Sequence, residues 1–385
     1  MVRPADSSIQ VALDVSCAAE SPITGIGYAA IYQLRALFAR EDPDFHFALF
    51  AAGGRGGAAI LDRELPGRPA RFIPYARLAK YYAWNNLNWP PIEWFTGPAR
   101  IAHNFSHQVP ATSRAIKVVT VHDLSMFRHP GTHTARAVEV QQTLLRSTAK
   151  RAGHIVAVSE SCKSELIDVL HVPADRIHVI HNGVNTAEFD APFDARRVNE
   201  LRQTHNIQGD YIIHLGTLEP RKNLVRLCEA YKQLLGRRDE LPKLVIVGAV
   251  GWGADPILEA IASLGDAVVR PGYLSRADAI LLLRGARACV YPSIYEGFGL
   301  PVLEAMAART PVITSNVSAL PEVAGEAALY IDPVNSDSIA HAIEQVLDDP
   351  AAAAARVATG RARAESFSWE TSAAKLADLY RDLAN

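Results

Sequence analysis

Short apolar runs alternate with longer stretches of helical periodicity along almost the whole chain. The first set is short, β-branched and bounded by turn residues, which predicts strands at 9–15, 45–51, 71–75, 101–105, 116–124 and 154–159. Helical patterns lie between them, for example at 28–40 and 135–152. Because strands that alternate with helices form right-handed βαβ units, we expect a parallel sheet here.

The same pattern then restarts. A second set of apolar runs predicts strands at 211–217, 243–249, 267–273, 288–293, 310–315 and 328–333, with helices at 223–238, 255–264, 276–286 and 301–309. The predicted fold class is therefore α/β, with two doubly wound, Rossmann-like domains that face each other across a cleft. We expect an N-terminal domain at 1–190, a C-terminal domain at 205–365, and a helix at 366–385 that packs back on the N-terminal domain.

Composition narrows the class of protein. A length of 385 residues suits two domains, and a net charge of −2 leaves no basic field to hold nucleic acid. The four cysteines are scattered without a C-x-x-C pair, which predicts buried thiols rather than a zinc site or a disulfide framework. The chain lacks a signal-peptide pattern and a run of ~18 apolar residues. We expect a cytoplasmic protein, at most peripheral to a membrane.

The stretch YEGFGLPVLE (295–304) follows a predicted strand and opens a predicted helix. Pro301 suits the first helical turn, whose free backbone N–H groups form an anion site. Gly297 and Gly299 allow close approach of the backbone to a ligand. Glu296 before the glycines and Glu304, expected in the first helical turn, then flank the anion site with acceptors for hydroxyl groups. The spacing predicts a diphosphate with a hydroxylated ring on each side. The alternative is a solvated loop residue and a favourable helix-start charge.

The ten residues resemble the E-x7-E motif of the retaining GT-B glycosyltransferases of family 4. The resemblance extends over residues 292–333, and GTLEPRKNL, VHDL, VSESCKSEL, VIHNGV and the terminal FSWE…LY have counterparts in the same order. The sequences GTLEPRKNL and VGAVGW are most similar to those of bacterial mannosyltransferases of surface-polysaccharide assembly, which use GDP-mannose. The resemblance implies that the C-terminal domain binds a nucleotide sugar.

The resemblance also implies roles for the residues of this motif. Glu304 corresponds to the glutamate that binds the nucleotide ribose, and Glu296 to the one that contacts hydroxyls of the transferred hexose. The loop between them lies along the sugar and reaches the diphosphate, through Gly297, Phe298, Gly299 and Leu300.

Two cations follow another predicted strand, in GTLEPRKN (216–223), which begins with Gly216. Fixed cations stabilise the charge that develops on a diphosphate leaving group. Lys222 corresponds to the phosphate-binding lysine of the family. Many members carry arginine where this chain has Thr217, and Arg221 is the candidate for that role. The alternative is a pair of solvent-facing cations at a helix start.

The predicted N-terminal domain contributes two further candidates. His122, in VHDL, corresponds to a position that contacts a hydroxyl of the transferred sugar, and Asp123 either fixes its tautomer or caps a helix. Gly25 and Gly27 open a helix after the first strand, where the family approaches the donor phosphate and the acceptor. For His122 the alternative is a structural histidine, and a lone G-x-G is weak on its own.

Donor and acceptor are less well defined by the sequence. Trp252 and Tyr273 lie in strand-end loops where a base could rest, but Trp252 is equally compatible with the domain core, and guanine and uracil are not distinguished. Arg309 stands where the family often has a helix-ending glycine. No metal cluster is evident, nor a D-x-D dyad of the kind with which metal-dependent transferases hold a diphosphate through a divalent ion, so we expect no metal and no cofactor besides the nucleotide sugar.

Residues 75–100 are unusually aromatic. They hold Trp84, Trp89 and Trp94 beside the cations Arg77, Lys80 and Arg100. Rings with flanking cations suit a membrane interface or a polyprenyl-diphosphate-linked glycan acceptor. The alternative is a packed pair of helices.

Three rival functions remain at this stage. A GT-B-shaped sugar-nucleotide epimerase shares the two-domain cleft, but the E-x7-E element favours a transferase. A nicotinamide oxidoreductase is expected to carry G-x-G-x-x-G, whereas this chain has GIGYAA at 25–30. A binding-only relative is disfavoured because Glu296, Glu304 and Lys222 are all present.

Overall fold

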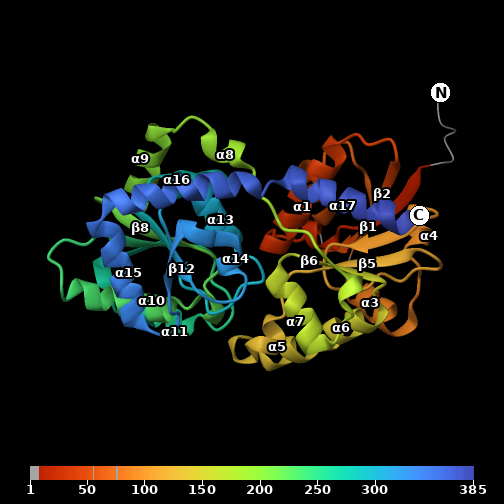
Figure 1. Cartoon of the computed structure of the whole chain (residues 1–385), viewed down its shortest axis with the longest axis horizontal. Helices are drawn as coiled ribbons and strands as arrows, with labels where there is room; N and C mark the ends of the chain where they lie inside the picture. Colours follow the sequence, from red (N-terminus) through yellow and green to blue (C-terminus); the bar gives the residue numbers. More distant parts are fainter. Residues whose placement is uncertain (1–7, 55, 75–76) are drawn as a thin grey trace. The chain divides into compact units, whose positions relative to one another are not determined.

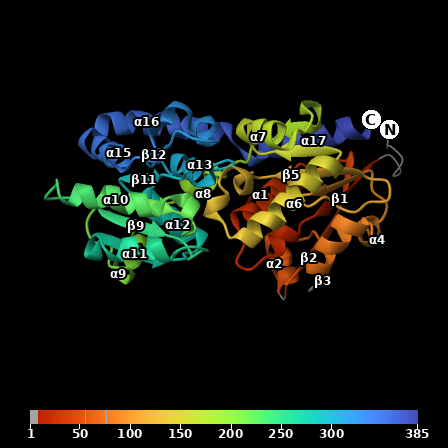
Figure 2. The same ribbon diagram turned by 90° about the horizontal axis from the view of Figure 1, so that it is seen from below.

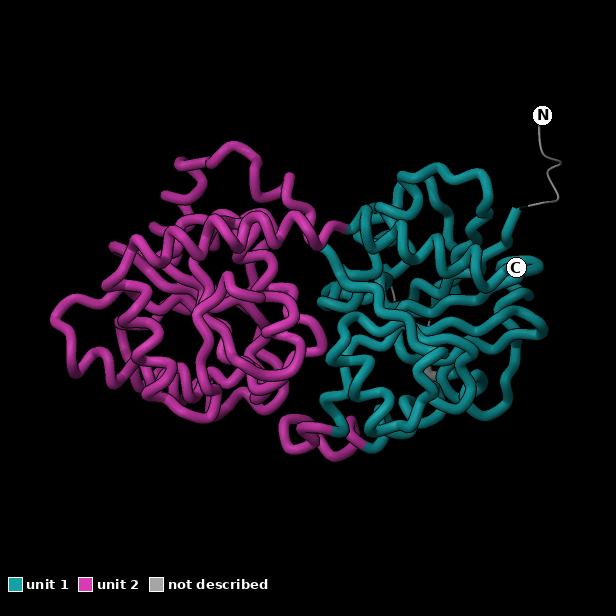
Figure 3. The backbone as a smooth tube through the Cα atoms, viewed as in Figure 1, with its two compact units in different colours: residues 1–127, 139–183, 369–385 teal, residues 128–138, 184–368 magenta. Residues whose placement is uncertain are grey.

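The computed structural model describes residues 8–54, 56–74 and 77–385, and the side chains of 74, 77 and 78 are outside that description. Tyr75, at the end of a predicted strand, and the side chain of Arg77 therefore lie outside it. Contacts within the chain define two compact units. Unit 1 comprises 1–127, 139–183 and 369–385, and unit 2 comprises 128–138 and 184–368 (Figure 3). The segment Arg128–Val138 thus groups with unit 2, although it lies inside the expected range 1–190.

Unit 1 is built on a seven-stranded parallel sheet with the order β3-β2-β1-β4-β5-β6-β7. Its strands are β1 (Ile9–Asp14), β2 (Phe45–Gly53), β3 (Ala70–Pro74), β4 (Ile101–Asn104), β5 (Ile116–Val121), β6 (His154–Ala157) and β7 (Ile177–Val179). The first six match the predicted strands closely. The periodicity gives no strand at Ile177–Val179, because this edge strand has only three residues and two of them are half-buried.

Unit 2 is built on a six-stranded parallel sheet with the order β10-β9-β8-β11-β12-β13. All six strands occur where the apolar runs predict them, as β8 (Tyr211–Leu215), β9 (Lys243–Val247), β10 (Val268–Gly272), β11 (Ala288–Tyr291), β12 (Val312–Ser315) and β13 (Ala328–Ile331). The central strands β11 and β12 are buried along their whole length, which explains their continuous apolar sequence.

Helices cover both faces of each sheet (Figures 1 and 2). The helices between the strands of the first sheet are α1 (Gly25–Ala39), α2 (Gly57–Glu64), α3 (Arg77–Tyr82), α4 (Glu93–Thr96), α5 (Ser125–Arg128), α6 (Ala135–Arg151) and α7 (Glu160–Leu170). Those of unit 2 are α8 (Thr186–Asp190), α9 (Ala195–Thr204), α10 (Leu224–Leu235), α11 (Asp255–Ala262), α12 (Arg276–Arg284), α13 (Leu300–Ala307), α14 (Leu320–Ala324), α15 (Ser336–Asp348) and α16 (Pro350–Ser366).

The last helix, α17 (Trp369–Ala384), packs on α1 within unit 1. Its Tyr380 is fully buried and its hydroxyl lies 2.5 Å from Nδ1 of His103, while Ser372 accepts a hydrogen bond of 2.9 Å from Gln33. These buried polar contacts fix the rotation of α17 in addition to its apolar packing. The C-terminal residues therefore complete the core of the unit that contains the N-terminal strand.

The helix α13 is followed by Arg309, which stands where the family often has glycine. Arg309 adopts the left-handed conformation, with a φ of 59°, that a glycine would adopt at lower cost. Its side chain donates to Asp190 at 2.8 Å, and Asp190 also accepts from Arg361. The residue that departs from the family's glycine thus ties the end of α13 to α8.

Candidate functional site

The candidate site of unit 2 gathers residues from two strand-end loops. The loop after β8 carries Arg221 and Lys222, and the loop after β11 carries Glu296. Strands β8 and β11 are neighbours in the sheet, so their carboxyl ends bring the two loops together. Sequence positions more than seventy residues apart therefore meet at the edge where parallel α/β sheets bind ligands.

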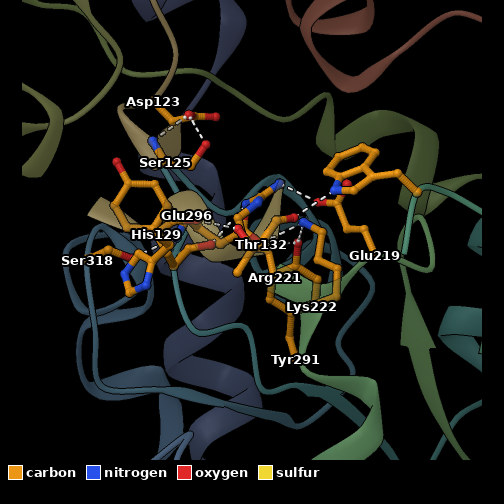
Figure 4. A network of polar contacts seen from close by, with 12 residues as sticks. Asp123, Ser125, His129, Thr132, Glu219, Arg221, Lys222, Tyr291, Glu296 and Ser318 are labelled. Atoms are coloured by element: carbon orange, nitrogen blue, oxygen red, sulfur yellow. Dashed lines mark hydrogen bonds and ion pairs between the residues drawn. The ribbon is translucent and has the colours of Figure 1, made fainter. Parts of the chain in front are cut away.

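Glu296 lies between the two cations (Figure 4). Lys222 Nζ donates to Glu296 Oε1 at 2.6 Å, and Arg221 Nη1 donates to Oε2 at 2.7 Å. A second carboxylate, Glu219, accepts from Arg221 Nη2 at 2.7 Å. The backbone N–H of Glu296 donates to Ser318 Oγ at 2.9 Å. Lys222 is buried and the side chain of Arg221 is 13% exposed, so the solvent-facing alternative for the two cations is wrong.

Burial and mutual charge shift the ionisation of these groups. Burial opposes ionisation of Glu296, but Arg221 and Lys222 outweigh it and lower its pKa to about 2. Burial lowers the pKa of Lys222 below its ordinary value, while Glu296 acts in the opposite direction. Burial also raises the pKa of Glu219, against the pull of Arg221 and Lys222. The result is a preformed carboxylate held rigidly between two cations.

Tyr291, the last residue of β11, belongs to the same network and was not among the sequence candidates. Its hydroxyl accepts from Lys222 Nζ at 2.6 Å and donates to Glu296 Oε1 at 2.9 Å. The ring of His214 stacks on it, with centroids 5.5 Å apart, and Nδ1 of His214 bonds the carbonyl of Val290. The available signal was its position at the carboxyl end of a buried strand next to the glutamate motif.

The loop that follows Glu296 is buried and enters α13. Gly299 has a φ of 108°, and a Cβ there would lie 2.8 Å from Leu320, so only glycine fits. Gly297 and Phe298 are buried beside it, and Leu300 is the first residue of α13. The sequence predicts an anion site at this helix start. In the structure the backbone N–H groups of Val302 and Leu303 donate to the carbonyl of Gly299 at 3.0 and 3.3 Å.

Glu304 does not join the network around Glu296. It lies in the second turn of α13 rather than the first, because the helix begins at Leu300. Its Oε1 accepts from Arg276 Nη1 at 2.7 Å. The interpretation of Glu304 as a first-turn helix charge is therefore wrong.

Other donor-side candidates are dispersed over unit 2. Tyr273 follows β10 and is 59% exposed. A Cβ on Gly216 would contact His214 and Lys222, so this glycine borders the network. Trp252 is 39% exposed, which excludes the core position, and its indole N–H donates to the carbonyl of Thr132 at 2.7 Å.

The remaining candidates lie in unit 1. Nε2 of His122 donates to the carbonyl of Phe105 at 2.9 Å, and burial lowers the pKa of this histidine, which favours a neutral ring. Asp123 accepts hydrogen bonds from the backbone N–H and the hydroxyl of Ser125, the first residue of α5. In α1, a Cβ on Gly27 would lie 2.7 Å from the carbonyl oxygen of Cys17, whereas one on Gly25 would meet nothing within 4 Å. Packing thus explains Gly27 but not Gly25.

The aromatic stretch divides into buried and exposed residues. Trp84 is buried, and Lys80 is buried in an ion pair of 2.7 Å with Asp14, so these two cannot contribute to a surface. Trp89 and Trp94 are 52% and 67% exposed and meet edge to face with centroids 5.5 Å apart. Part of the stretch is therefore packed, and part forms an exposed aromatic face.

Two searches of the described residues gave negative results. Within residues 8–54, 56–74 and 77–385, no group of three or more His, Cys, Asp and Glu side chains is arranged to hold a metal ion. Over the same part of the chain, none of the helices has the length and apolar character required to span a bilayer.

Comparison with known proteins gives consistent matches. The family model described as glycosyl transferases group 1 matches residues 198–363, and that of glycosyltransferase family 4 matches 117–188. O-antigen chain mannosyltransferase B of Escherichia coli is 36% identical over 268 residues, which cover 69% of this chain and 70% of that protein.

Solved structures match the chain over nearly its whole length. A glycosyltransferase from Rickettsia africae ESF-5 superposes with a TM-score of 0.74 over 98% of both chains, at 19% identity. The Anabaena protein HepE, in complex with UDP-glucose, gives a TM-score of 0.74 over 97% of this chain and 100% of its own, at 16% identity. At these identities the similarity is one of fold.

Proposed function

We propose that this chain, which belongs to the family 4 glycosyltransferases (glycosyl transferases group 1), transfers mannose from GDP-mannose to a glycan or polyprenyl-diphosphate-linked acceptor. It is a glycosyltransferase, and its two α/β units, each built on a parallel sheet, form the GT-B fold. The choice of mannose rests on the O-antigen mannosyltransferase that shares 36% of its residues over two thirds of the chain.

The observation that carries this proposal is the buried network of Lys222, Arg221 and Glu296 beside the start of α13. A diphosphate leaving group needs fixed positive charge, and two cations and a helix start supply it. Glu296 is ionised and immobilised, so it is suited to accept hydroxyl groups of the transferred sugar. In this arrangement the cations both orient Glu296 and face the leaving group.

We propose that transfer retains the anomeric configuration. The bond between C1 of the sugar and the β-phosphate oxygen breaks, and a bond from C1 to the acceptor oxygen forms on the same face. The proton of the acceptor hydroxyl passes to the leaving diphosphate. His122 is proposed to accept a hydroxyl of the transferred sugar at Nδ1, since its Nε2 donates to the backbone. Proton NMR of the fresh product tests this: a β-mannoside formed from the α-linked donor would contradict retention.

Calorimetric titration with GDP, UDP, ADP and their mannose or glucose conjugates, without metal, is the decisive test of the donor. We expect selective binding of GDP and GDP-mannose. Glu296→Ala and Lys222→Ala are expected to abolish most transfer, and Glu304→Ala is expected mainly to weaken donor binding. Preference for another nucleotide would contradict the mannose assignment, and near-wild-type transfer by Glu296→Ala would contradict the site.

A second candidate is a UDP-sugar-dependent glycosyltransferase of the same fold. It is favoured by the structural match to HepE, whose structure was solved with UDP-glucose. The same titration separates the two candidates, because UDP and UDP-glucose would then bind more tightly than GDP and GDP-mannose.

We further propose that transfer needs no divalent metal ion. Lys222 and Arg221 carry the positive charge that metal-dependent transferases supply through an ion bound to a carboxylate dyad. Transfer is expected to continue after treatment with EDTA. Loss of transfer that manganese restores would contradict this proposal.

We also propose that the exposed face of Trp89 and Trp94 contacts the inner surface of the membrane that carries a lipid-linked acceptor. Tyr82 and Leu87, on the same stretch, are 63% and 61% exposed, and interfacial aromatic residues bind at the headgroup level. Cosedimentation with anionic liposomes is expected for the wild type and reduced for Trp89→Ser/Trp94→Ser. Equal sedimentation with and without liposomes would contradict this contact.

A further inference from the structure

We infer that Arg276 is a positioning residue for Glu304, held in place by Glu188 of α8, and that this ion-pair chain sets the affinity of the site for the ribose of the donor. The inference rests on the proposed function, in which Glu304 binds the ribose. It assigns roles to two residues that neither the motif nor the network around Glu296 includes.

Arg276 bridges the two carboxylates with different nitrogen atoms. Its Nε donates to Glu188 Oε2 at 2.7 Å, and its Nη1 donates to Glu304 Oε1 at 2.7 Å. The three side chains are 28%, 24% and 22% exposed, so the chain of ion pairs is shielded more than an ordinary surface pair. Two short, charge-assisted bonds from one planar group fix the guanidinium in a single orientation.

Arg276 binds one carboxylate oxygen of Glu304, Oε1, and thereby fixes the orientation of the other oxygen, Oε2. No described residue forms a hydrogen bond with Glu304 Oε2, which leaves that atom to accept a ribose hydroxyl. A carboxylate on a helix surface otherwise loses side-chain entropy when a ligand fixes it. Arg276 removes that loss in advance, because the rotamer of Glu304 is already set by the ion pair.

The position of Arg276 in its helix supports a role beyond helix stability. Ser275 caps α12 by accepting from the backbone N–H of Asp278 at 3.1 Å, so Arg276 is the first residue of the helix. A cation there opposes the positive end of the helix dipole. The two carboxylates compensate for this, and neither of them belongs to α12.

Glu188 connects this arrangement to the segment that joins the units. The chain passes from unit 1 to unit 2 between Gly183 and Val184, and α8 begins at Thr186. Glu188 therefore holds Arg276 from the connecting segment itself. The rotamer of Glu304, the residue proposed to bind the ribose, thus depends on the position of α8.

Binding of ribose-modified nucleotides tests the inference. We compare the dissociation constants of GDP with those of 2′-deoxy-GDP and 3′-deoxy-GDP by calorimetry, and run the corresponding UDP series in parallel. For the wild type we expect about a tenfold or larger penalty for the missing hydroxyl that Glu304 accepts, the size of a hydrogen bond to a charged group. In Arg276→Gln this penalty is expected to fall to about twofold, with GDP itself bound roughly tenfold more weakly. Glu188→Gln is expected to lie between the two proteins.

Arg284→Gln is the matched control. Arg284 lies at the opposite end of the same helix, where it donates to the backbone carbonyl of Ala191 and lies over the ring of Phe193. This variant is expected to keep the wild-type penalty. In transfer assays Arg276→Gln is expected to raise the KM of the donor while kcat at saturation changes less than twofold.

The outcomes separate the inference from the proposed function. A wild-type protein that binds GDP and UDP no more tightly than their deoxy forms would overturn the ribose role of Glu304, and the inference with it. A wild-type penalty that persists in Arg276→Gln would overturn the inference alone. Tighter binding of GDP by Arg276→Gln would also overturn it, because Arg276 would then compete with the ribose.

Discussion

Each unit has a buried cation–carboxylate cluster at the carboxyl edge of its sheet, and the two clusters differ in composition. In unit 1, Asp14 at the end of β1 accepts from Lys80 at 2.7 Å and from the neutral amide of Asn104 at 2.9 Å. In unit 2, Glu296 accepts from Lys222 and Arg221, and Arg221 also binds Glu219. One cluster has a single ion pair, whereas the other has two cations and two carboxylates joined by three ion pairs.

The surroundings of the two clusters differ as well. Lys80 lies 4.9 Å from the ring centroid of Trp84, so the unit 1 cluster anchors the aromatic stretch to the sheet. The unit 2 cluster lies beside Gly216 and the loop that leads through Gly299 into a helix start. Position at a strand end therefore does not by itself mark a site. The glycine-lined approach and the second cation distinguish the site from the anchor.

The largest effect that we expect is on stability, from Lys80→Met. It leaves the buried carboxylate of Asp14 without its cationic partner in unit 1, which costs about 3–5 kcal/mol. Urea unfolding measures this loss. Lys117→Met is the control, because Lys117 forms only an exposed bond to Asn88 and its loss is expected to cost less than about 1 kcal/mol. Equal losses in the two variants would refute the anchoring role.

Lys222→Met is expected to have the next largest effect, on activity. In the proposed function Lys222 faces the leaving group, and removal of one such preorganised charge typically lowers kcat by about 100- to 1000-fold. Lys232→Met, at an exposed position of α10, is the control and is expected to transfer at the wild-type rate. Steady-state transfer assays with GDP-mannose compare them. Similar kcat values would place the catalytic charge elsewhere.

Tyr291→Phe is expected to lower activity by about tenfold. It removes the hydroxyl that bridges Lys222 and Glu296, a loss typical of one buried hydrogen bond to a charged group. Tyr211→Phe is matched to it, because Tyr211 is also fully buried and donates to the carbonyl of Leu282 at 2.6 Å. Both variants are expected to lose similar stability, but only Tyr291→Phe to lose transfer. A parallel loss in both would reduce Tyr291 to a structural role.

The smallest expected effect is on the free energy of unfolding, and it is seen only at acidic pH. The pKa of Glu296 is lowered from 4.5 to about 2, so its ionised form stabilises the folded state. That contribution is complete above about pH 4.5 and is lost as the pH falls towards 2. Urea midpoints of the wild type are expected to fall more steeply over this range than those of Glu296→Gln. Parallel curves would show that the carboxylate does not stabilise unit 2.

Most of the architecture follows from apolar periodicity. Twelve strands lie where the runs predict them. Strands such as Ala288–Tyr291 are buried along their whole length in a parallel sheet, and this gives them a continuous apolar sequence. The three-residue strand Ile177–Val179 lies at a sheet edge and has too few buried positions to give a signal. Residues 191–204, which lie between the two expected domains, contain the helix α9 (Ala195–Thr204).

The candidate site was partly predictable, for a physical reason. Glu296, Arg221 and Lys222 lie in loops with a sequence pattern, and they converge because their strands are neighbours. Tyr291 and Arg276 act through side-chain contacts between elements distant in the sequence, and no local pattern marks such contacts. The ion pairs that Arg221 and Lys222 form with Glu296 likewise depend on tertiary packing.

The grouping of Arg128–Val138 with unit 2 affects how the protein can be dissected. The chain passes between the units four times, at 127/128, 138/139, 183/184 and 368/369, so no single cut separates them. A fragment of residues 184–368 would lack the carbonyl of Thr132 that Trp252 binds and the ring of His129 that lies against Tyr295. Donor affinities measured on such a fragment would therefore not represent those of the whole chain. A split-protein reporter would need its break inside a surface loop of one unit.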